Sequence, residues 1–134
     1  MSGLAALRRT ERKLRAHGLA KPEAYEEFPW GDRALKVAKK IFAIMNCDAE
    51  NGLTLTVKLG ALSEEVLQLP FTAPTGYGLG KSGWVTARFA PGEAPPTGML
   101  CDWLDESYAL VAPKKLTARK AGARGADRSS GRVR

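Results

Sequence analysis

"RALKVAKKIFAIMN", residues 33–46, is the stretch on which the fold of this chain depends. A helical stripe with i, i+3, i+4 spacing accounts for Leu35, Ala38, Ile41, Phe42 and Met45. Alternation along a strand accounts for Leu35 and Val37, and, after a break, for Ile41, Ala43 and Met45. Periodicity alone leans towards a helix here, so the rest of the chain must decide between one helix and two strands.

Two other stretches predict strands without this ambiguity. In "GLTLTVKLG" (52–60), apolar residues alternate with two threonines and Lys58, which is typical of a half-buried strand between glycines. In "WVTARF" (84–89), Val85, Ala87 and Phe89 share one face, and Trp84, Thr86 and Arg88 share the other. The chain therefore contains a sheet with one apolar face.

Helical periodicity predicts three further elements. Residues 4–16 form a basic amphipathic helix that Gly18 can close, and residues 63–69 form a short helix. The strongest helix covers 99–112 and ends before Pro113. Its apolar stripe is Leu100, Trp103, Leu104, Ser107, Tyr108 and Val111, and Asp102, Asp105 and Glu106 are expected to face solvent. Residues 21–32 and 90–98 are rich in turn residues and are expected to be connections.

Charge divides the chain into two parts. Residues 1–113 hold 13 Lys or Arg and 13 Asp or Glu, whereas residues 114–134 hold eight basic residues and one acid. Apolar periodicity ends near Leu116, and Ala, Gly, Arg and Ser follow. We therefore expect one folded domain over 1–116 and a basic, disordered tail over 117–134.

Composition excludes several function classes. Cys47 and Cys101 lie 54 positions apart and His17 is the one histidine, so no structural zinc site and no Cys-His or Ser-His-Asp nucleophile is expected. Both thiols are expected to be free. No apolar run is long enough to span a bilayer, and the first 18 residues lack the apolar core of a signal peptide. We expect a cytoplasmic monomer without cofactor or metal, and no enzyme.

The glycine run "GYGLGKSGW" (76–84) resembles two phosphate-binding motifs but fits neither. A P-loop needs glycine five positions before Gly80, where this chain has Thr75. Both a P-loop and a dinucleotide loop must lead into a helix, whereas Gly83 leads into the strand composition of 84–89. The glycines are instead expected to let a mobile loop turn sharply into an edge-accessible strand.

Four segments together resemble the MmcQ/YjbR family of small bacterial proteins. They are "FPWGD" (28–32), "KVAKKIFA" (36–43), "GKSGWVTARF" (80–89) and "WLDESYALVAPKKL" (103–116). With the strand at 53–59, the resemblance covers roughly residues 5 to 116. It implies an α+β fold of the CyaY/YjbR-like, double-wing type: an antiparallel β-sheet meander with N- and C-terminal helices packed on one face. The family uses the segment at 36–43 as a β-hairpin, which implies paired strands at 34–38 and 40–46. Relatives often have glycine at the hairpin turn, where this chain has Ala38 and Lys39.

The resemblance also implies DNA binding, a description that rests on likeness to winged DNA-binding modules and brings no catalytic residues. We expect weak sequence specificity, with DNA favoured over RNA as the partner. The candidate nucleic-acid-binding residues are Lys36, Lys58, Lys81, Trp84, Arg88, Lys114, Lys115, Arg119 and Lys120.

Three alternatives remain open at this point. A protein-interaction or small-ligand module would use a pocket lined by Trp103, Ser107 and Tyr108, although their helical stripe favours the core. A frataxin-like iron role is disfavoured because positions 8–15 hold five basic residues and one acid. For the strand residues, an ordinary solvent-facing surface is the plain interpretation, with Trp84 lying under the C-terminal helix.

Overall fold

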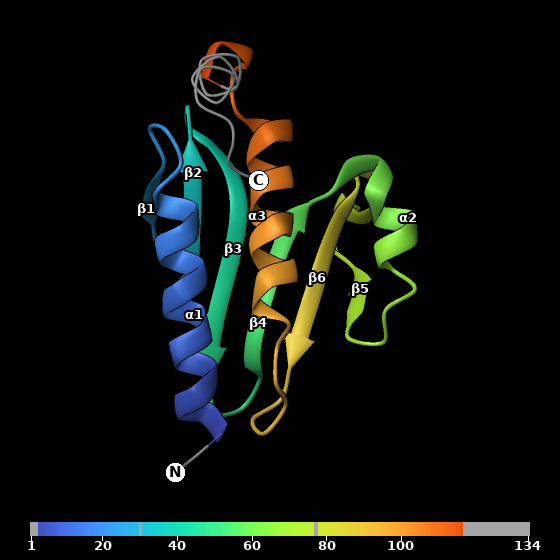
Figure 1. The fold of residues 1–134 in the computed structure, drawn as a ribbon. Helices are drawn as coiled ribbons and strands as arrows, with labels where there is room; N and C mark the ends of the chain where they lie inside the picture. The colour runs from blue at the N-terminus through green and yellow to red at the C-terminus, as the bar shows by residue number, and fades with distance from the viewer. Residues whose placement is uncertain (1–2, 30, 77, 117–134) are drawn as a thin grey trace.

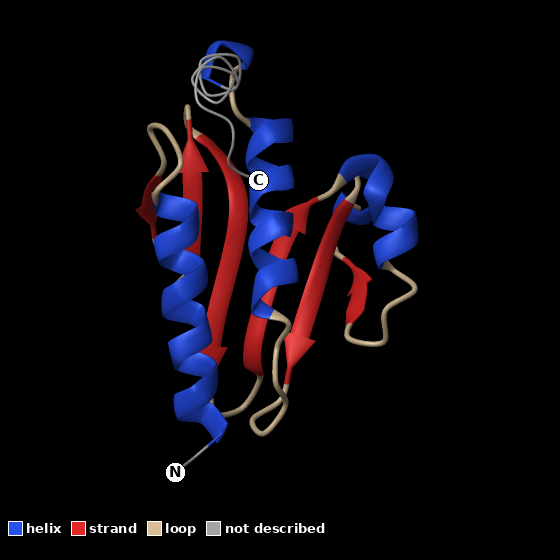
Figure 2. Cartoon of the chain, in the orientation of Figure 1, coloured by secondary structure: helices blue, strands red, loops and turns tan. Residues whose placement is uncertain are grey.

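The computed structural model describes residues 3–29, 31–76 and 78–116. The N-terminal helix α1 (Gly3–Leu19) and the C-terminal helix α3 (Thr97–Val111) pack side by side on one face of a six-stranded antiparallel sheet (Figure 1). Figure 2 shows the two layers, with these helices in blue over the strands in red. The expected α+β fold is confirmed.

The sheet has the order β1-β2-β3-β4-β6-β5. Its strands are β1 (Tyr25–Glu27), β2 (Arg33–Val37), β3 (Lys40–Asp48), β4 (Gly52–Lys58), β5 (Thr72–Pro74) and β6 (Trp84–Phe89). Strands β1 to β4 follow one another as a meander, and β6 pairs with β4. The short strands β1 and β5 form the edges, and the sequence pattern did not predict either. Because β5 pairs with β6, the prediction that residues 84–89 form an edge-accessible strand is wrong.

Residues 33–46 form a hairpin and not a helix, as the resemblance implied. Leu35 pairs with Ala43 but Lys36 pairs with Ile41, so Phe42 is an extra residue in β3. This β-bulge turns both Phe42 and Ala43 into the core, where neither is exposed. The bulge breaks the alternation along the strand, and this break made the stretch resemble a helix.

The hairpin turn consists of Ala38 and Lys39, which have φ values of 51° and 68°. A two-residue hairpin loop with both φ values positive is a type I′ turn, which favours Asn-Gly. Left-handed backbone costs other residues about 1–2 kcal/mol. This chain therefore keeps backbone strain at both positions of the turn.

We expect Lys39→Gly to stabilise the domain by about 1 kcal/mol, because glycine adopts a positive φ without a steric penalty. Urea unfolding followed by circular dichroism measures the change. Lys40→Gly is the control: Lys40 begins β3 in extended backbone, so glycine there should destabilise. A loss of stability in Lys39→Gly would contradict the strained turn.

The shorter elements complete the chain. A 3-10 turn η1 (Gly60–Leu62) leads into α2 (Ser63–Val66), a single turn that is shorter than the predicted 63–69 helix. A second 3-10 turn, η2 (Leu79–Ser82), precedes β6. Gly18 lies inside α1 and does not end it, contrary to prediction. A Cβ there would lie 2.5 Å from Leu35 Cδ1, so glycine lets the helix pack on Leu35 without displacing that side chain.

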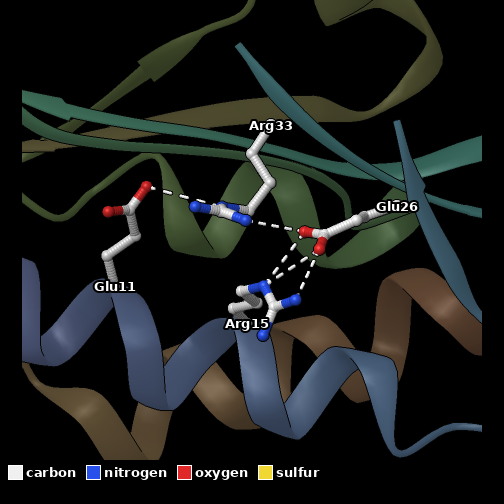
Figure 3. Close-up of polar contacts among 4 residues, drawn as sticks. All are labelled: Glu11, Arg15, Glu26 and Arg33. Atoms are coloured by element: carbon white, nitrogen blue, oxygen red, sulfur yellow. Dashed lines mark hydrogen bonds and ion pairs between the residues drawn. The ribbon is translucent and has the colours of Figure 1, made fainter. Parts of the chain in front are cut away.

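An ion-pair network joins α1 to the edge strand β1. Glu26 of β1 accepts hydrogen bonds from Arg15 of α1, at 3.0 Å from Nε, and from Arg33 of β2, at 2.6 Å from Nη1 (Figure 3). Glu11 of α1 lies 3.7 Å from Arg33 Nε. The hydrogen bond from Arg15, helped by Arg33, lowers the pKa of Glu26. Strand β1 has only three residues, and none of them is buried. The network therefore helps to hold this strand in place.

A second polar cluster joins α1 to α3. Asp105 accepts a 2.8 Å contact from His17 Nε2 and pairs with Lys21. Burial opposes ionisation of Asp105, but the two partners outweigh it and lower the pKa to about 2. Asp105 therefore faces α1, and the prediction that it belongs to a solvent-facing acidic row is wrong.

Candidate nucleic-acid interface

The face of the sheet opposite α1 and α3, here called the open face, carries polar side chains. Leu53, Leu55 and Val57 of β4 are fully buried, whereas Thr54, Thr56 and Lys58 between them are partly exposed. In β6 the buried residues are Val85, Ala87 and Phe89. Because successive side chains point to opposite faces, Trp84, Thr86 and Arg88 lie on the open face. Trp84 is therefore not under the C-terminal helix.

Two of the predicted residues, Lys58 and Trp84, meet at one end of the open face, and a third, Lys81, lies in the loop before β6, where it lines a hollow with Ser63 and Glu64 of α2. Lys58 and Trp84 are directly paired across β4 and β6. Lys81 is exposed in η2, three residues before β6 begins. Lys58 and Lys81 have no ion-pair partner within the described part of the chain. This end combines two free ammonium groups with a half-buried indole, a combination that suits phosphate and base contacts.

The glycine loop positions Lys81 but does not form a phosphate-binding motif. Gly78 and Gly83 flank η2 in left-handed conformation, with φ values of 78° and 86°. Strand β6 follows at Trp84, so the loop leads into a strand and not into a helix, which confirms the interpretation from sequence. Gly83 also packs on Gly60: a Cβ at Gly83 would lie 2.6 Å from the backbone nitrogen of Gly60.

Arg88 lies towards the other end of the open face. It pairs with Thr54, which places it roughly 13 Å along β6 from Trp84 at about 3.3 Å per residue. It lines a hollow of about 760 Å³ between the sheet and the loop before η2. The lining residues are Asp32, Ile44, Asn46, Asn51, Thr54, Thr56, Thr75, Gly76, Leu79, Thr86 and Arg88.

A row of threonine hydroxyls crosses the floor of this hollow. Thr86 Oγ1 lies 2.9 Å from Thr56 Oγ1 and 3.0 Å from Thr75 Oγ1. Sequence reasoning placed Thr86 on the outward face but did not predict the row. The signal that could have found it is the threonine at the outward position of both strands. Hydroxyls and amides can bind polar ligands because they act both as hydrogen-bond donors and as acceptors.

The remaining predicted residues lie elsewhere. Lys36 donates a 2.9 Å hydrogen bond to Glu27 Oε1, which raises the pKa of Lys36. The Lys36 ammonium is therefore already paired with a carboxylate. Lys114 and Lys115 are exposed just after α3, at the end of the molecule where the β2–β3 turn also lies (top of Figure 1). Arg119 and Lys120, with the predicted tail 117–134, lie outside the described residues.

The pocket considered for an interaction module is core. Trp103, Ser107 and Tyr108 are 7%, 0% and 2% exposed. Tyr108 packs edge-on against Phe42, and its hydroxyl donates to the carbonyl of Pro22 at 2.7 Å. These side chains hold α3 on the sheet and leave no room for a ligand between them.

The other predictions on site chemistry have simple outcomes. Cys47 and Cys101 are free, as predicted, and burial raises the pKa of both thiols. Within 3–29, 31–76 and 78–116, no three Cys, His, Asp or Glu residues gather to hold a metal. No helix among these residues is long and apolar enough to cross a membrane.

The two helices on one face and the polar open face define an α+β protein with an accessible antiparallel sheet. The sequence model of the YjbR family matches residues 19–110, so the chain belongs to the YjbR family. The fold is similar to the crystal structure of Deinococcus radiodurans protein DR2400, described as a DUF419 domain. The two share 27% identity with a TM-score of 0.64 over 86% of this chain and 87% of that one. No curated protein matches the chain.

Proposed function

We propose that this YjbR-family protein binds DNA with little sequence preference, through the open face and the basic C-terminal segment. The observation that carries the proposal is the cross-strand pair of Lys58 and Trp84 beside Lys81, with Arg88 further along the same face. Cations release counterions from phosphates, and a half-exposed indole can stack on a base. No described helix projects base-reading side chains from this face, which supports weak specificity.

The C-terminal segment supplies the second part of the proposal. Residues 114–134 carry eight of the 21 basic residues and one acid, and the preceding 113 residues are neutral overall. This segment therefore supplies the net positive charge that attracts a polyanion over long range. The open face then provides the short-range contacts.

One observation favours a second function, the binding of a small polar ligand. The hollow at Arg88 combines one guanidinium with a row of hydroxyls, two amides and the carboxylate of Asp32. Such a lining suits a carboxylate-bearing or phosphate-bearing metabolite better than an apolar one. The module would then be regulatory and not a nucleic-acid binder.

A salt titration of DNA binding separates the two parts of the proposal. Deleting residues 117–134 should flatten the plot of log K against log salt by about 0.9 for each duplex phosphate that the tail neutralises, a change of several units. Trp84→Ala should weaken binding about 5- to 100-fold at fixed salt and leave the slope unchanged, because an uncharged ring displaces no counterion.

Trp84→Phe is the matched control, since it keeps an aromatic ring and should retain most of the affinity. Thermal unfolding of each variant verifies that the fold is intact. If the tail deletion abolishes all binding and Trp84→Ala changes nothing, the open face does not bind DNA. The small-ligand function would then lead.

A further inference from the structure

The outward surface of α1 carries a cluster of cations that the proposed function does not use. Its members, here called the α1 cluster, are exposed and lie in the first three turns: Arg8, Arg9, Arg12 and Lys13. Residues four apart lie on the same side of a helix, so these four form two adjacent pairs. Leu7 and Leu14, which are fully buried, anchor the other side of α1 to the core.

No acidic side chain among the described residues forms an ion pair with the α1 cluster. The acid within this helix, Glu11, is only 14% exposed and faces Arg33, and the fifth base, Arg15, is taken by Glu26 (Figure 3). The four cations of the cluster have no ion-pair partner in the part of the chain that the structure describes. Like charges at this spacing weaken a helix, so the arrangement is unfavourable for the isolated domain.

The concentration of charge on α1 contrasts with the rest of the folded domain. Residues 3–19 hold five Lys or Arg and one acid, whereas residues 20–113 hold eight Lys or Arg and twelve acids. The domain is therefore neutral in total but strongly polarised. A neutral count over residues 1–113 conceals a basic surface on one helix.

A fixed hollow adjoins the α1 cluster. Arg9, Thr10 and Lys13 line it on one side, and residues 92–95 line it on the other. Gly3 packs so closely on Gly92 that a Cβ there would lie 2.3 Å from the Gly92 nitrogen, which holds the two walls together. Glu93 accepts a 2.6 Å hydrogen bond from the Ala90 amide, so its carboxylate is held in its own turn. The hollow thus presents the two cations Arg9 and Lys13 beside one carboxylate, Glu93, whereas the Thr10 hydroxyl donates to the carbonyl of Ala6 at 3.3 Å.

The chemistry of the surface identifies its partner as a chain of phosphates. Cations one helical turn apart repeat about every 6 Å along α1, a spacing that suits a regular row of anions. Membrane-binding helices also insert large apolar side chains, but the exposed apolar residues within α1 are the small side chains of Ala6 and Ala16. The combination favours the sugar-phosphate backbone of a nucleic acid over a lipid surface.

We propose that the α1 cluster is a second phosphate-binding surface, so that one molecule holds two DNA segments on opposite sides of its sheet. Helix α1 covers one face of the sheet (Figure 1). The alternation of buried and exposed residues along β4 and β6 places Lys58, Trp84 and Arg88 on the other face. A single straight duplex cannot contact both layers at once. This proposal rests on the proposed function, because the open face must bind the first DNA segment if the α1 cluster is to bind a second one.

The experiment uses the full chain with all four cluster residues replaced by glutamine (R8Q/R9Q/R12Q/K13Q). We expect the slope of log K against log salt to fall by roughly 2–4 units on duplex DNA. Energy transfer between two differently labelled duplexes should rise with the parent protein and disappear with the variant. The tail is present in both proteins, so the difference reports α1 alone.

A charge-retaining variant, R8K/R9K/R12K, should keep both signals and so exclude a loss of folding as the cause. If the glutamine variant behaves as the parent while Trp84→Ala weakens binding, the α1 proposal is overturned and the proposed function stands. If neither the glutamine variant nor Trp84→Ala changes binding, both the α1 proposal and the proposed function are contradicted. If the slope falls but energy transfer persists, the two-segment arrangement is wrong. If the variant loses binding only to vesicles of anionic phospholipid, the surface is a membrane contact and the proposal fails.

Discussion

Replacing Gly83 with alanine is expected to destabilise the domain by about 4 kcal/mol, a large part of the roughly 5–15 kcal/mol that holds a domain of this size. Two costs add at this position. The φ of 86° is strained for a residue with a Cβ, which costs about 1–2 kcal/mol. The Cβ would also lie 2.6 Å from the Cα and nitrogen of Gly60, where backbone atoms cannot give way as a flexible side chain does.

The second cost reaches into the sheet. The carbonyl of Gly83 accepts hydrogen bonds from the amides of Leu59, at 2.8 Å, and Gly60, at 3.2 Å. These bonds close the end of β4 against the start of β6. Moving the backbone of Gly83 away from Gly60 breaks them and displaces Trp84, the next residue.

Gly78→Ala is the matched control for this prediction. Gly78 has a similar φ of 78°, but a Cβ there would have nothing within 4 Å. The variant should be destabilised by about 1–2 kcal/mol, from backbone strain alone. Urea unfolding of both variants isolates the packing against Gly60 as the difference. Equal destabilisation of the two variants would show that the close approach contributes nothing.

Ser107→Ala is expected to cost about 3 kcal/mol, although alanine is the better helix former. The Ser107 hydroxyl donates to the carbonyl of Phe42 at 2.5 Å and accepts from the amide of Lys58 at 2.9 Å. The β3–β4 pairing ends at Ala43 and Val57, next to the bulge at Phe42. The carbonyl of Phe42 and the amide of Lys58 therefore do not form a hydrogen bond with each other. Alanine would leave two backbone polar groups beside the core unsatisfied, at about 1–3 kcal/mol each.

Urea unfolding measures the destabilisation, and hydrogen exchange of the Lys58 amide, which should accelerate, locates it. Ser82→Ala is the control, because Ser82 is exposed in η2 and its replacement should change stability by less than about 0.5 kcal/mol. A Ser107→Ala variant as stable as this control would mean that the bridge between α3 and the two strands is not needed.

Local pattern determined the elements that bury one face. The alternation in β4 and β6 predicted both strands and their outward residues, because a half-buried strand must alternate. The same holds for α3, whose predicted stripe is buried except at Val111, which is partly exposed. Rejection of a P-loop also followed from local sequence, since Gly83 precedes strand residues.

Contacts between distant residues decided the rest. The hairpin at 33–46 could not be predicted from periodicity, because the bulge at Phe42 interrupts the alternation of inward and outward side chains along β3. The carbonyl of Phe42 accepts its hydrogen bond from Ser107, 65 positions away in the sequence. In the sequence Gly18 is typical of a helix end, whereas in the structure it lies within α1 and packs against Leu35. The short edge strands β1 and β5 have too few residues to show a pattern, and β1 is held by ion pairs to α1.

For the candidate sites, the sequence by itself determined which residues carry charge, and the tertiary structure decided which of those charges are free. Lys36 and Lys81 look alike in sequence, but Lys36 has Glu27 beside it across β1 and β2, whereas Lys81 has no such partner in the described chain. The α1 cluster was visible as basic residues, yet its significance depended on Glu11 and Arg15 turning towards Arg33 and Glu26. Charge is a property of the residue, but the field that a partner meets depends on which opposite charges the fold brings within a few ångströms.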